Sequence, residues 1–374
     1  MIKHVSSFHL TNVSYDPNRA HPVSNSVSSA LIPLGSDPES RVYYLNMENL
    51  TRFGVILEDL DTFAGWLAYK HNQGDKVPMG TPDHHKMAIV TACVDHIDMQ
   101  NSIIQSDLDI HMQGYVSWVG KSSMETTMTL AQKYGDGDMR EILTAKFVMV
   151  SLDPDTKTPV SNVKLLVETE EEKERFKRGE WAKSVRKAQE QNSLLKTVPT
   201  EIERTILHDL FLKTLDYKSM SFHNRTLPAG HVWLEDARLK NSILCFPSKR
   251  NLHGKIFGGY LMRTAYETAW ANSAIFSKCR PRIMAVDNII FRKSVEVGSL
   301  LLLSSQICYS TDRFMQVSVD AIVMDYLTQK CELTNTFQFT FKADKEVPLI
   351  MPKSYTDGII YLNGRRHFNA SAHP

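Results

Sequence analysis

Residues 55–71 and 260–276 each place apolar side chains three or four positions apart, which is the period of an α-helix that packs one face against a core. In the first segment, VILEDLDTFAGWLAYKH, this face runs from Leu57 to His71. Each segment follows a loop that ends in glycine, which permits a tight entry into a helix. The pattern predicts two helices that lie about 205 residues apart in the chain.

Strand-like segments follow each predicted helix in the same order, and the last pair alternates apolar and polar residues as half-buried strands do. Three pairs match: 94–98 with 286–290, 122–130 with 312–323, and 143–152 with 333–342. The offset falls from about 205 to about 190 residues along the chain, so the loops of the two copies differ in length. Ordered matches of this kind indicate an internal duplication.

The duplication predicts an α+β fold in which each copy has one central helix wrapped by an antiparallel sheet. We expect an N-terminal tail at 1–39, a first domain at 40–153, a charged linker at 154–200, a second domain at 201–345 and a C-terminal tail at 346–374. In the linker, Glu, Lys and Arg recur every three or four residues, which predicts a solvated helix with internal ion pairs.

Composition narrows the class of protein. The 374 residues are 42% apolar and 23% charged, enough for two ordinary cores, and the formal net charge of +1 offers no field for nucleic acid or an anionic membrane. The longest apolar stretches are too short to span a membrane. The five cysteines show no CxxC pair and no metal-ligand spacing, so we expect reduced thiols and no bound metal.

The first 36 residues are rich in serine and contain a single acidic residue, Asp16. This composition is typical of an organelle transit peptide. Only two basic residues are present and no amphipathic arginine helix is evident, so a disordered tail explains the segment equally well.

The string RNLHGKIFGGYLMR at 250–263 is the most specific motif of the chain. Gly258 and Gly259 allow close approach of a ligand to the backbone and leave free amides where a helix begins. Free amides at that position suit a carbonyl that develops negative charge. A tight turn alone explains the glycines equally well, and the spacing differs from that of a phosphate-binding P-loop.

Three carboxylates, Glu58, Asp59 and Asp61, precede the middle of the first predicted helix. At about 100° per residue, Asp61 lies beside the apolar face and the other two lie further away. A carboxylate at a buried margin has a raised pKa, which suits a general base. Glu58 and Asp59 are explained by the positive end of the helix dipole, which lies in the first turn.

Other hydrolytic motifs are missing from the sequence. There is no GxSxG elbow, no cysteine-nucleophile signature and no HExxH motif. A Ser–His–Asp triad therefore has little support.

LEDLDTFAGWLAYKH and RNLHGKIFGGYLMRTAYETAWANS, with matching strands after each, together resemble the double-hotdog acyl-CoA thioesterases, in particular the mitochondrial type. The resemblance covers about residues 40–345. It implies two tandem hotdog domains that form an intrachain pseudo-dimer, and hydrolysis of fatty acyl-CoA to free acid and CoA without a cofactor. It also implies a mitochondrial matrix location, with the cytoplasm as the alternative.

The resemblance implies a catalytic pair from different domains. Asp61 matches the position of the aspartate that activates water, and Asn251, seven residues before the first glycine of the GG pair, matches the asparagine that orients substrate or water. Gly258 and Gly259 are the implied substrate contacts at the helix entry, with the Gly259 amide as oxyanion donor. Arg250 and His253 are further candidate substrate contacts.

The phosphates of CoA call for basic residues near the site. Lys249 with Arg250, and Arg365 with Arg366, are the candidates, although surface solubility explains each as well. By analogy with the family we expect a homo-oligomer, a trimer of double-hotdog chains.

We expect one working site per chain. At an offset of 205 residues Asn46 matches Asn251, but Tyr266 stands where Asp61 stands in the first copy, and the neighbouring Glu267 points away from the apolar face. Two alternative functions remain on the same fold. One is an acyl-CoA hydratase or dehydratase, for which only His253 could act as the catalytic histidine, and the other is a non-catalytic scaffold that binds acyl-CoA.

Overall fold

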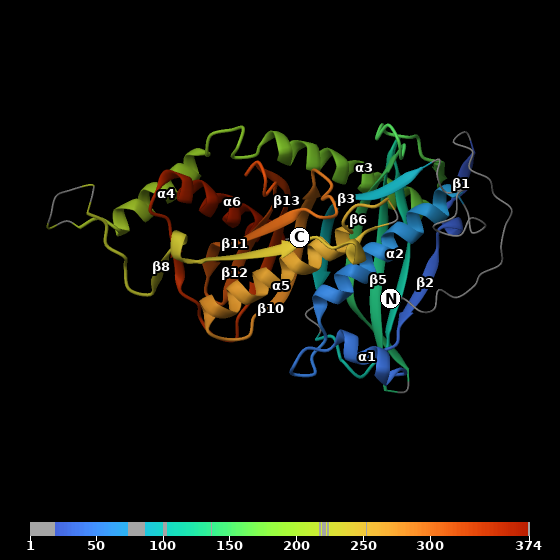
Figure 1. The fold of residues 1–374 in the computed structure, drawn as a ribbon, viewed down its shortest axis with the longest axis horizontal. Coiled ribbons are helices and arrows are strands. Elements are labelled where there is room, and N and C mark those ends of the chain that lie inside the picture. Colours follow the sequence, from blue (N-terminus) through green and yellow to red (C-terminus); the bar gives the residue numbers. More distant parts are fainter. Residues whose placement is uncertain are drawn as a thin grey trace. The chain divides into compact units, whose positions relative to one another are not determined.

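The computed structural model describes residues 19–73, 87–99, 103–135, 137–216, 218, 222, 224–251 and 253–372. Figure 1 shows the chain as a ribbon with its elements labelled. The chain groups into two compact units. Unit 1 comprises the described parts of Met1–Lys183, Cys245–Thr264 and Asn288–Gly298, and unit 2 those of Ser184–Leu244, Ala265–Asp287 and Ser299–Pro374.

Unit 1 is built around helix α2 and an antiparallel sheet. Helix α2 spans Phe53–Gln73, two residues beyond the predicted segment at each end. The strands follow the order β2-β4-β5-β6-β3. Their bounds are Ser28–Ile32, Ile110–Val119, Ser123–Tyr134, Asp138–Leu152 and Ala88–Met99. The expected α+β layout, a long helix packed on an antiparallel sheet, is present in this unit (Figure 1).

Helix α2 packs closely on the sheet because a glycine faces it. Leu57, Leu60 and Leu67 are fully buried on the predicted apolar face. A Cβ atom at Gly114 of β4 would lie 2.7 Å from the Leu67 side chain and 3.1 Å from Phe63. The absence of a side chain at Gly114 therefore sets how near the helix approaches the sheet.

The N-terminal segment expected to be a tail is partly structured. Strand β1 (Ala20–Pro22) pairs in parallel with β7 (Lys164–Leu166), and β2 joins the main sheet. Helix α1 (Pro38–Tyr44) is capped at its N-terminus by Asp37, whose side chain accepts hydrogen bonds from the amides of Glu39 and Ser40. Residues 1–18, which carry much of the possible transit peptide, lie outside the described residues.

The charged linker forms helix α3, Glu170–Gln191, as predicted. Its expected ion pairs are present between Lys173 and Glu170 and between Arg175 and Glu171. One side of this helix is covered: Gly179 lies against fully buried Trp118, whose indole donates to Glu180 at 2.6 Å. The linker is therefore also a packing element of unit 1.

Unit 2 repeats the arrangement with helix α5, Gly258–Ser277, whose residues from Ala265 onward belong to this unit. Its strands follow the order β10-β13-β12-β11-β9, with bounds Arg282–Phe291, Cys331–Lys342, Phe314–Met324, Leu300–Thr311 and Arg238–Leu244. In β10, the residues up to Asp287 belong to this unit. Phe337, Phe339 and Phe341 are fully buried along β13, and Tyr266 of α5 packs on the last two.

The expected C-terminal tail instead forms strand β14 (Leu349–Met351) and helix α6 (Tyr355–Ala372). Strand β14 pairs in parallel with β8 (His231–Trp233). A Cβ atom at Gly364 would lie 2.5 Å from Cys308, so α6 packs directly on β11. Hydrophobic spacing did not predict this helix because some of its contacts with the rest of the protein are made by polar residues such as Arg366.

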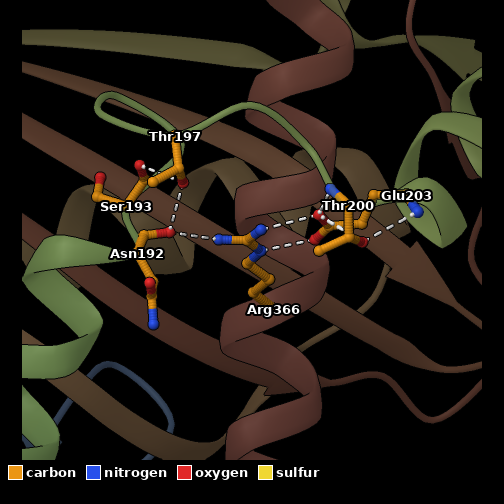
Figure 2. Close-up of polar contacts among 6 residues, drawn as sticks. All are labelled: Asn192, Ser193, Thr197, Thr200, Glu203 and Arg366. Carbon is orange, nitrogen blue, oxygen red and sulfur yellow. Dashed lines mark hydrogen bonds and ion pairs between the residues drawn. The ribbon is translucent and has the colours of Figure 1, made fainter.

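Helix α6 is also bonded to helix α4, Glu201–Lys213. The Arg366 guanidinium donates to both carboxylate oxygens of Glu203, at 2.6 and 2.8 Å, and to the carbonyl of Asn192 at 2.9 Å (Figure 2). Glu203 also closes a capping box with Thr200 at the start of α4. Within the described residues, no helix is long and apolar enough to cross a membrane.

Candidate active site

The site centres on Asp61 in the middle of α2. Asp61 follows Leu57 by one helical turn and precedes Ala64 by nearly one turn, so the helical period carries it to the covered side, where it is 3% exposed. The Thr91 hydroxyl of β3 donates to its Oδ1 at 2.5 Å, and the backbone amide of Gly259 donates to its Oδ2 at 2.6 Å. Both carboxylate oxygens are thus fixed by donors that carry no charge.

These surroundings tune the acid–base behaviour of Asp61. Burial raises the pKa of its carboxyl to about 6, while the bonds from Thr91 and Gly259 favour the ionised form and limit the rise. A carboxylate with such a pKa is ionised at neutral pH and remains basic enough to take a proton from water.

Both glycines of the motif begin α5 beside α2. A Cβ atom at Gly259 would lie 2.8 Å from the Cα of Glu58, and one at Gly258 would lie 3.1 Å from the Asp61 carboxylate. Only glycine at 259 lets the start of α5 approach the backbone of α2 so closely. Residues 245–264 belong to the second copy of the duplication, and the structure places them in unit 1 with Asp61.

Asn251 holds the loop before α5 in shape. Its side-chain oxygen accepts the amides of His253 at 2.9 Å and Lys255 at 3.1 Å, and its own amide donates to the carbonyl of Lys255. The two side-chain bonds use Oδ1 and the third uses the backbone amide of Asn251, so the Nδ2 donors take no part in them. No hydrogen bond between Asn251 and Asp61 is present among the described residues.

The loop at Asn46 has the same geometry. Asn46 Oδ1 accepts the amides of Glu48 and Leu50, and its amide donates to the carbonyl of Leu50. Bridges close the two loops at Leu45–Thr51 and Arg250–Ile256. Every one of these partners is displaced by 205 residues, so the match of Asn46 with Asn251 is reproduced bond by bond.

His253 points at α2. Its Nε2 is 3.0 Å from the Tyr69 hydroxyl, which accepts the amide of Ile89 at 2.9 Å. Tyr69 lies two turns after Asp61 on α2, and Ile89 lies two residues before Thr91 on β3. The loop of Asn251 and the carboxylate of Asp61 are therefore fixed to the same helix and the same strand.

The basic candidates fall in different places. Arg250 is exposed, and Lys249 lies over the ring of Tyr260 at 5.3 Å, near the loop. The Arg366 guanidinium donates its hydrogen bonds to Glu203 and to the Asn192 carbonyl in unit 2. An intramolecular carboxylate therefore occupies the Arg366 guanidinium, and the structure adds no support for Arg366 as the candidate for CoA phosphates.

The position equivalent to Asp61 in the second copy has no acid. Tyr266 stands there, half-buried, and its ring packs against Phe339 and Phe341, which are buried in unit 2. Its neighbour Glu267 is exposed, as predicted.

The other acids of α2 are covered as well, contrary to the expectation that the helix dipole alone explains them. Asp59 is 6% exposed and accepts the Tyr44 hydroxyl at 2.7 Å, and burial raises its pKa to about 6. Glu58 bonds Arg263 at 3.2 Å. Residues of α1 and α5 cover these acids, which a helical wheel of α2 alone does not reveal.

Thr91 and Tyr69 were not predicted as site residues. Thr91 is 30 residues from Asp61 and carries no motif, so only the pairing of α2 with β3 brings it to the carboxylate. Tyr69 lies within the predicted helix, two turns after Asp61, and this spacing was the one sequence signal that places it on the same side of the helix.

Comparison with known proteins relates the chain to enzymes. It is 45% identical over 350 residues to human mitochondrial acyl-coenzyme A thioesterase 9, covering 94% of this chain and 78% of that protein. It is 44% identical over 352 residues to mouse mitochondrial acyl-coenzyme A thioesterase 10, covering 94% of this chain and 79% of that one. No protein-family model matches the chain.

The fold also matches a solved structure, that of a putative oleoyl thioesterase from Lactobacillus plantarum. The TM-score is 0.53 at 10% sequence identity, and the match covers 85% of this chain and 96% of that one. At this identity the likeness establishes a shared fold, the tandem hotdog arrangement expected from the duplication.

Proposed function

The chain belongs to the acyl-coenzyme A thioesterase family, and from that premise we propose that Asp61 is the base that activates the hydrolytic water. The chain is a thioester hydrolase that acts on acyl-CoA. It is mitochondrial, as are the relatives at 44–45% identity, and the matrix is our proposed compartment.

In the proposed reaction the ionised Asp61 takes a proton from water while the water oxygen attacks the thioester carbonyl. A tetrahedral oxyanion forms. It collapses with cleavage of the carbon–sulfur bond, and the proton held by Asp61 passes to the departing CoA thiolate. The supporting observation is a buried carboxylate whose pKa is about 6 and whose two oxygens are fixed by Thr91 and Gly259.

Gly259 and Asn251 are the proposed partners of the substrate. The Gly259 amide donates to Asp61 in the structure, so it can stabilise an oxyanion only when the carbonyl oxygen competes for that N–H. The Nδ2 donors of Asn251, unused in its loop, suit orientation of the water or the carbonyl. Gly258 provides space beside Asp61 rather than a side-chain contact.

Arg250 remains our proposed contact for the CoA phosphates, since it is exposed next to this loop. For His253 we propose a positioning role in place of direct contact with substrate. Its side chain bonds Tyr69, and its backbone amide bonds Asn251, so it ties the asparagine loop to the helix of Asp61.

We further propose one working site per chain, with the two domains extended beyond 40–153 and 201–345 to include β2 in the first and β14 and α6 in the second. Tyr266 in place of an acid supports the single site. A homotrimer is proposed by family analogy, and light scattering would then give three times the 42.6 kDa of one chain.

The test is thiol release from palmitoyl-CoA and shorter acyl-CoAs. We expect turnover by the wild type, a loss of about 10²- to 10⁴-fold in kcat for Asp61→Asn, and full activity for the exposed control Glu267→Gln. Binding of acyl-CoA with no thiol released at any chain length would establish the scaffold alternative. Hydration of an enoyl-CoA that is lost in His253→Ala would establish the hydratase alternative.

A further inference from the structure

A cavity of about 470 Å³ lies in unit 2 between helix α4, the segment at Arg225 and the start of α6. Its volume lies in the range of small-molecule sites. Among the described residues, four basic side chains line it and no carboxylate does: Arg204, His208, Arg225 and Lys353. These lining residues are separate from the Asp61 site.

Helix α4 presents one face to this cavity. Arg204, His208 and Phe211 follow each other at spacings of four and three residues, which places them on one side of a helix. The His208 and Phe211 rings stack at 6.2 Å. None of the three acids of this helix, Glu201, Glu203 and Asp209, lines the cavity. Glu203 bonds Arg366 instead (Figure 2).

Arg225 is oriented at the wall by two hydrogen bonds and a ring contact. Its Nε donates to Thr214 Oγ1 at 2.5 Å, its Nη1 donates to the Lys353 carbonyl at 3.3 Å, and its guanidinium lies 4.6 Å from the centre of the Phe211 ring. None of these partners is a carboxylate, and burial lowers the pKa of this arginine. The described part of the chain thus fixes a cation at the cavity without placing a counter-ion beside it.

Lys353 and Arg204 contribute unequally to the positive charge of the cavity. Lys353 is partly neutralised by Glu235 at 3.0 Å. The Arg204 side chain is exposed and makes no hydrogen bond or ion pair within the part of the chain that the structure describes. Two guanidinium groups therefore face the cavity with donors to spare, next to apolar and aromatic walls that include Phe211 and Tyr355.

We propose that this cavity binds a small organic anion, whose carboxylate or phosphate is held by Arg225 and Arg204 and whose flat or apolar body packs on Phe211 and Tyr355. Guanidinium groups bind such heads through paired hydrogen bonds, and an anion removes the mutual repulsion of the basic side chains. Aromatic walls favour a ligand with an apolar or planar part over a bare ion.

Calorimetry on the full chain with decanoate, AMP and inorganic phosphate tests the site. We expect decanoate or AMP to bind more tightly than phosphate, with affinity lowered about tenfold or more in Arg225→Gln and several-fold in Arg204→Gln. The exposed strand residue Lys240 gives the matched control, and Lys240→Gln should leave the affinity unchanged. Because the Arg204 side chain bonds none of the described residues, its replacement should not disturb the fold.

The two organic probes distinguish the ligand's source. Preference for AMP assigns a planar phosphate ligand, and preference for decanoate assigns a fatty carboxylate. Absence of binding by both probes, or binding that Arg204→Gln and Arg225→Gln leave unchanged, would overturn the proposal. Equal affinity for phosphate and AMP together with no binding of decanoate would overturn the role of the aromatic walls.

Discussion

The carboxylate of Asp61 accepts the backbone amide of Gly259 at 2.6 Å, across 198 residues of sequence. This bond joins the middle of α2 to the first turn of α5, at the point where Gly259 leaves no room for a side chain. A substitution at either residue therefore affects both the protonation of Asp61 and the packing at the start of α5. Substitutions at these and neighbouring residues can separate the effect on catalysis from the effect on stability.

Asp61→Asn should make the folded protein more stable at neutral pH even though it lowers kcat. The folded-state pKa of about 6 exceeds the ordinary value of 3.8, so ionised Asp61 costs up to about 3 kcal/mol above pH 6. Between about pH 6 and 4 the folded state holds a proton that the unfolded state lacks, and wild-type stability gains as pH falls. Urea unfolding of both proteins at pH 7.5 checks the sign, and a less stable variant would refute the burial argument.

The activity of the wild type should rise with pH through about 6 and then level, because the base must be ionised. Thr91→Val removes a hydrogen bond that favours the ionised form, so the midpoint should move upward, and Thr91→Ser should restore it. Asp59 also has a pKa of about 6 and provides the control. A midpoint of kcat/KM that moves in Asp59→Asn and stays fixed in Thr91→Val would show that the titration belongs to Asp59.

Tyr69→Phe should lower kcat several-fold with the fold intact, because the ring stays and only the hydroxyl that His253 and Ile89 share is lost. His253→Ala removes the same link from its other end. If the pair positions the Asn251 loop, the double variant should be no worse than the poorer single variant. Strictly additive losses in kcat would show that the two residues act separately.

Gly259→Ala should destabilise the protein by about 1–3 kcal/mol and reduce activity strongly, since the new Cβ would lie 2.8 Å from a backbone atom of Glu58. Gly65, in the middle of α2, offers a matched control because a Cβ atom added there would meet nothing within 4 Å. Gly65→Ala should stabilise the helix by about 0.5–1 kcal/mol. Thermal unfolding and thiol release measure both, and an active Gly259→Ala enzyme would contradict the close approach.

Arg366→Gln should lower the free energy of unfolding by about 1–2 kcal/mol, a value reduced because the arginine is partly exposed to solvent. Arg366 holds the pKa of Glu203 at about 2, so this contribution is present above pH 4.5 and is lost as pH falls toward 2. Arg365→Gln on the same helix is the control. Equal destabilisation by both changes at pH 7 would mean that helix content alone matters.

The helices and strands that the sequence predicted correctly are those whose hydrophobic residues recur with the period of a helix or a strand. Both long helices and the three strand pairs are present, since each buries one face in its own repeat. Helix α6 was missed because its contacts with β11 and Glu203 come from residues more than 50 positions away. The helix packs through Gly364, and a glycine gives no hydrophobic signal.

For the site, the helical wheel correctly placed Asp61 on the covered side, but it placed Asp59 far from the apolar face although Asp59 is buried. A helical wheel describes the directions of side chains on one helix only, and it does not include Tyr44 of α1, which covers Asp59 from another element. Thr91 could not be predicted because the partner of a buried acid depends on which strand lies beside the helix. The catalytic roles of Asp61 and Asn251 stay predictions until the variants are measured.

The loops at Asn46 and Asn251 share the same set of loop bonds, yet only one of the two equivalent helix positions carries an acid. In an assembly of identical single-copy chains, one mutation changes both sites together. Once both copies lie in one polypeptide, each position mutates alone, and a catalytic acid can be replaced by a packing residue such as Tyr266. Gene fusion thus allows one copy to be selected for stability while the other keeps the destabilising buried charge of the base.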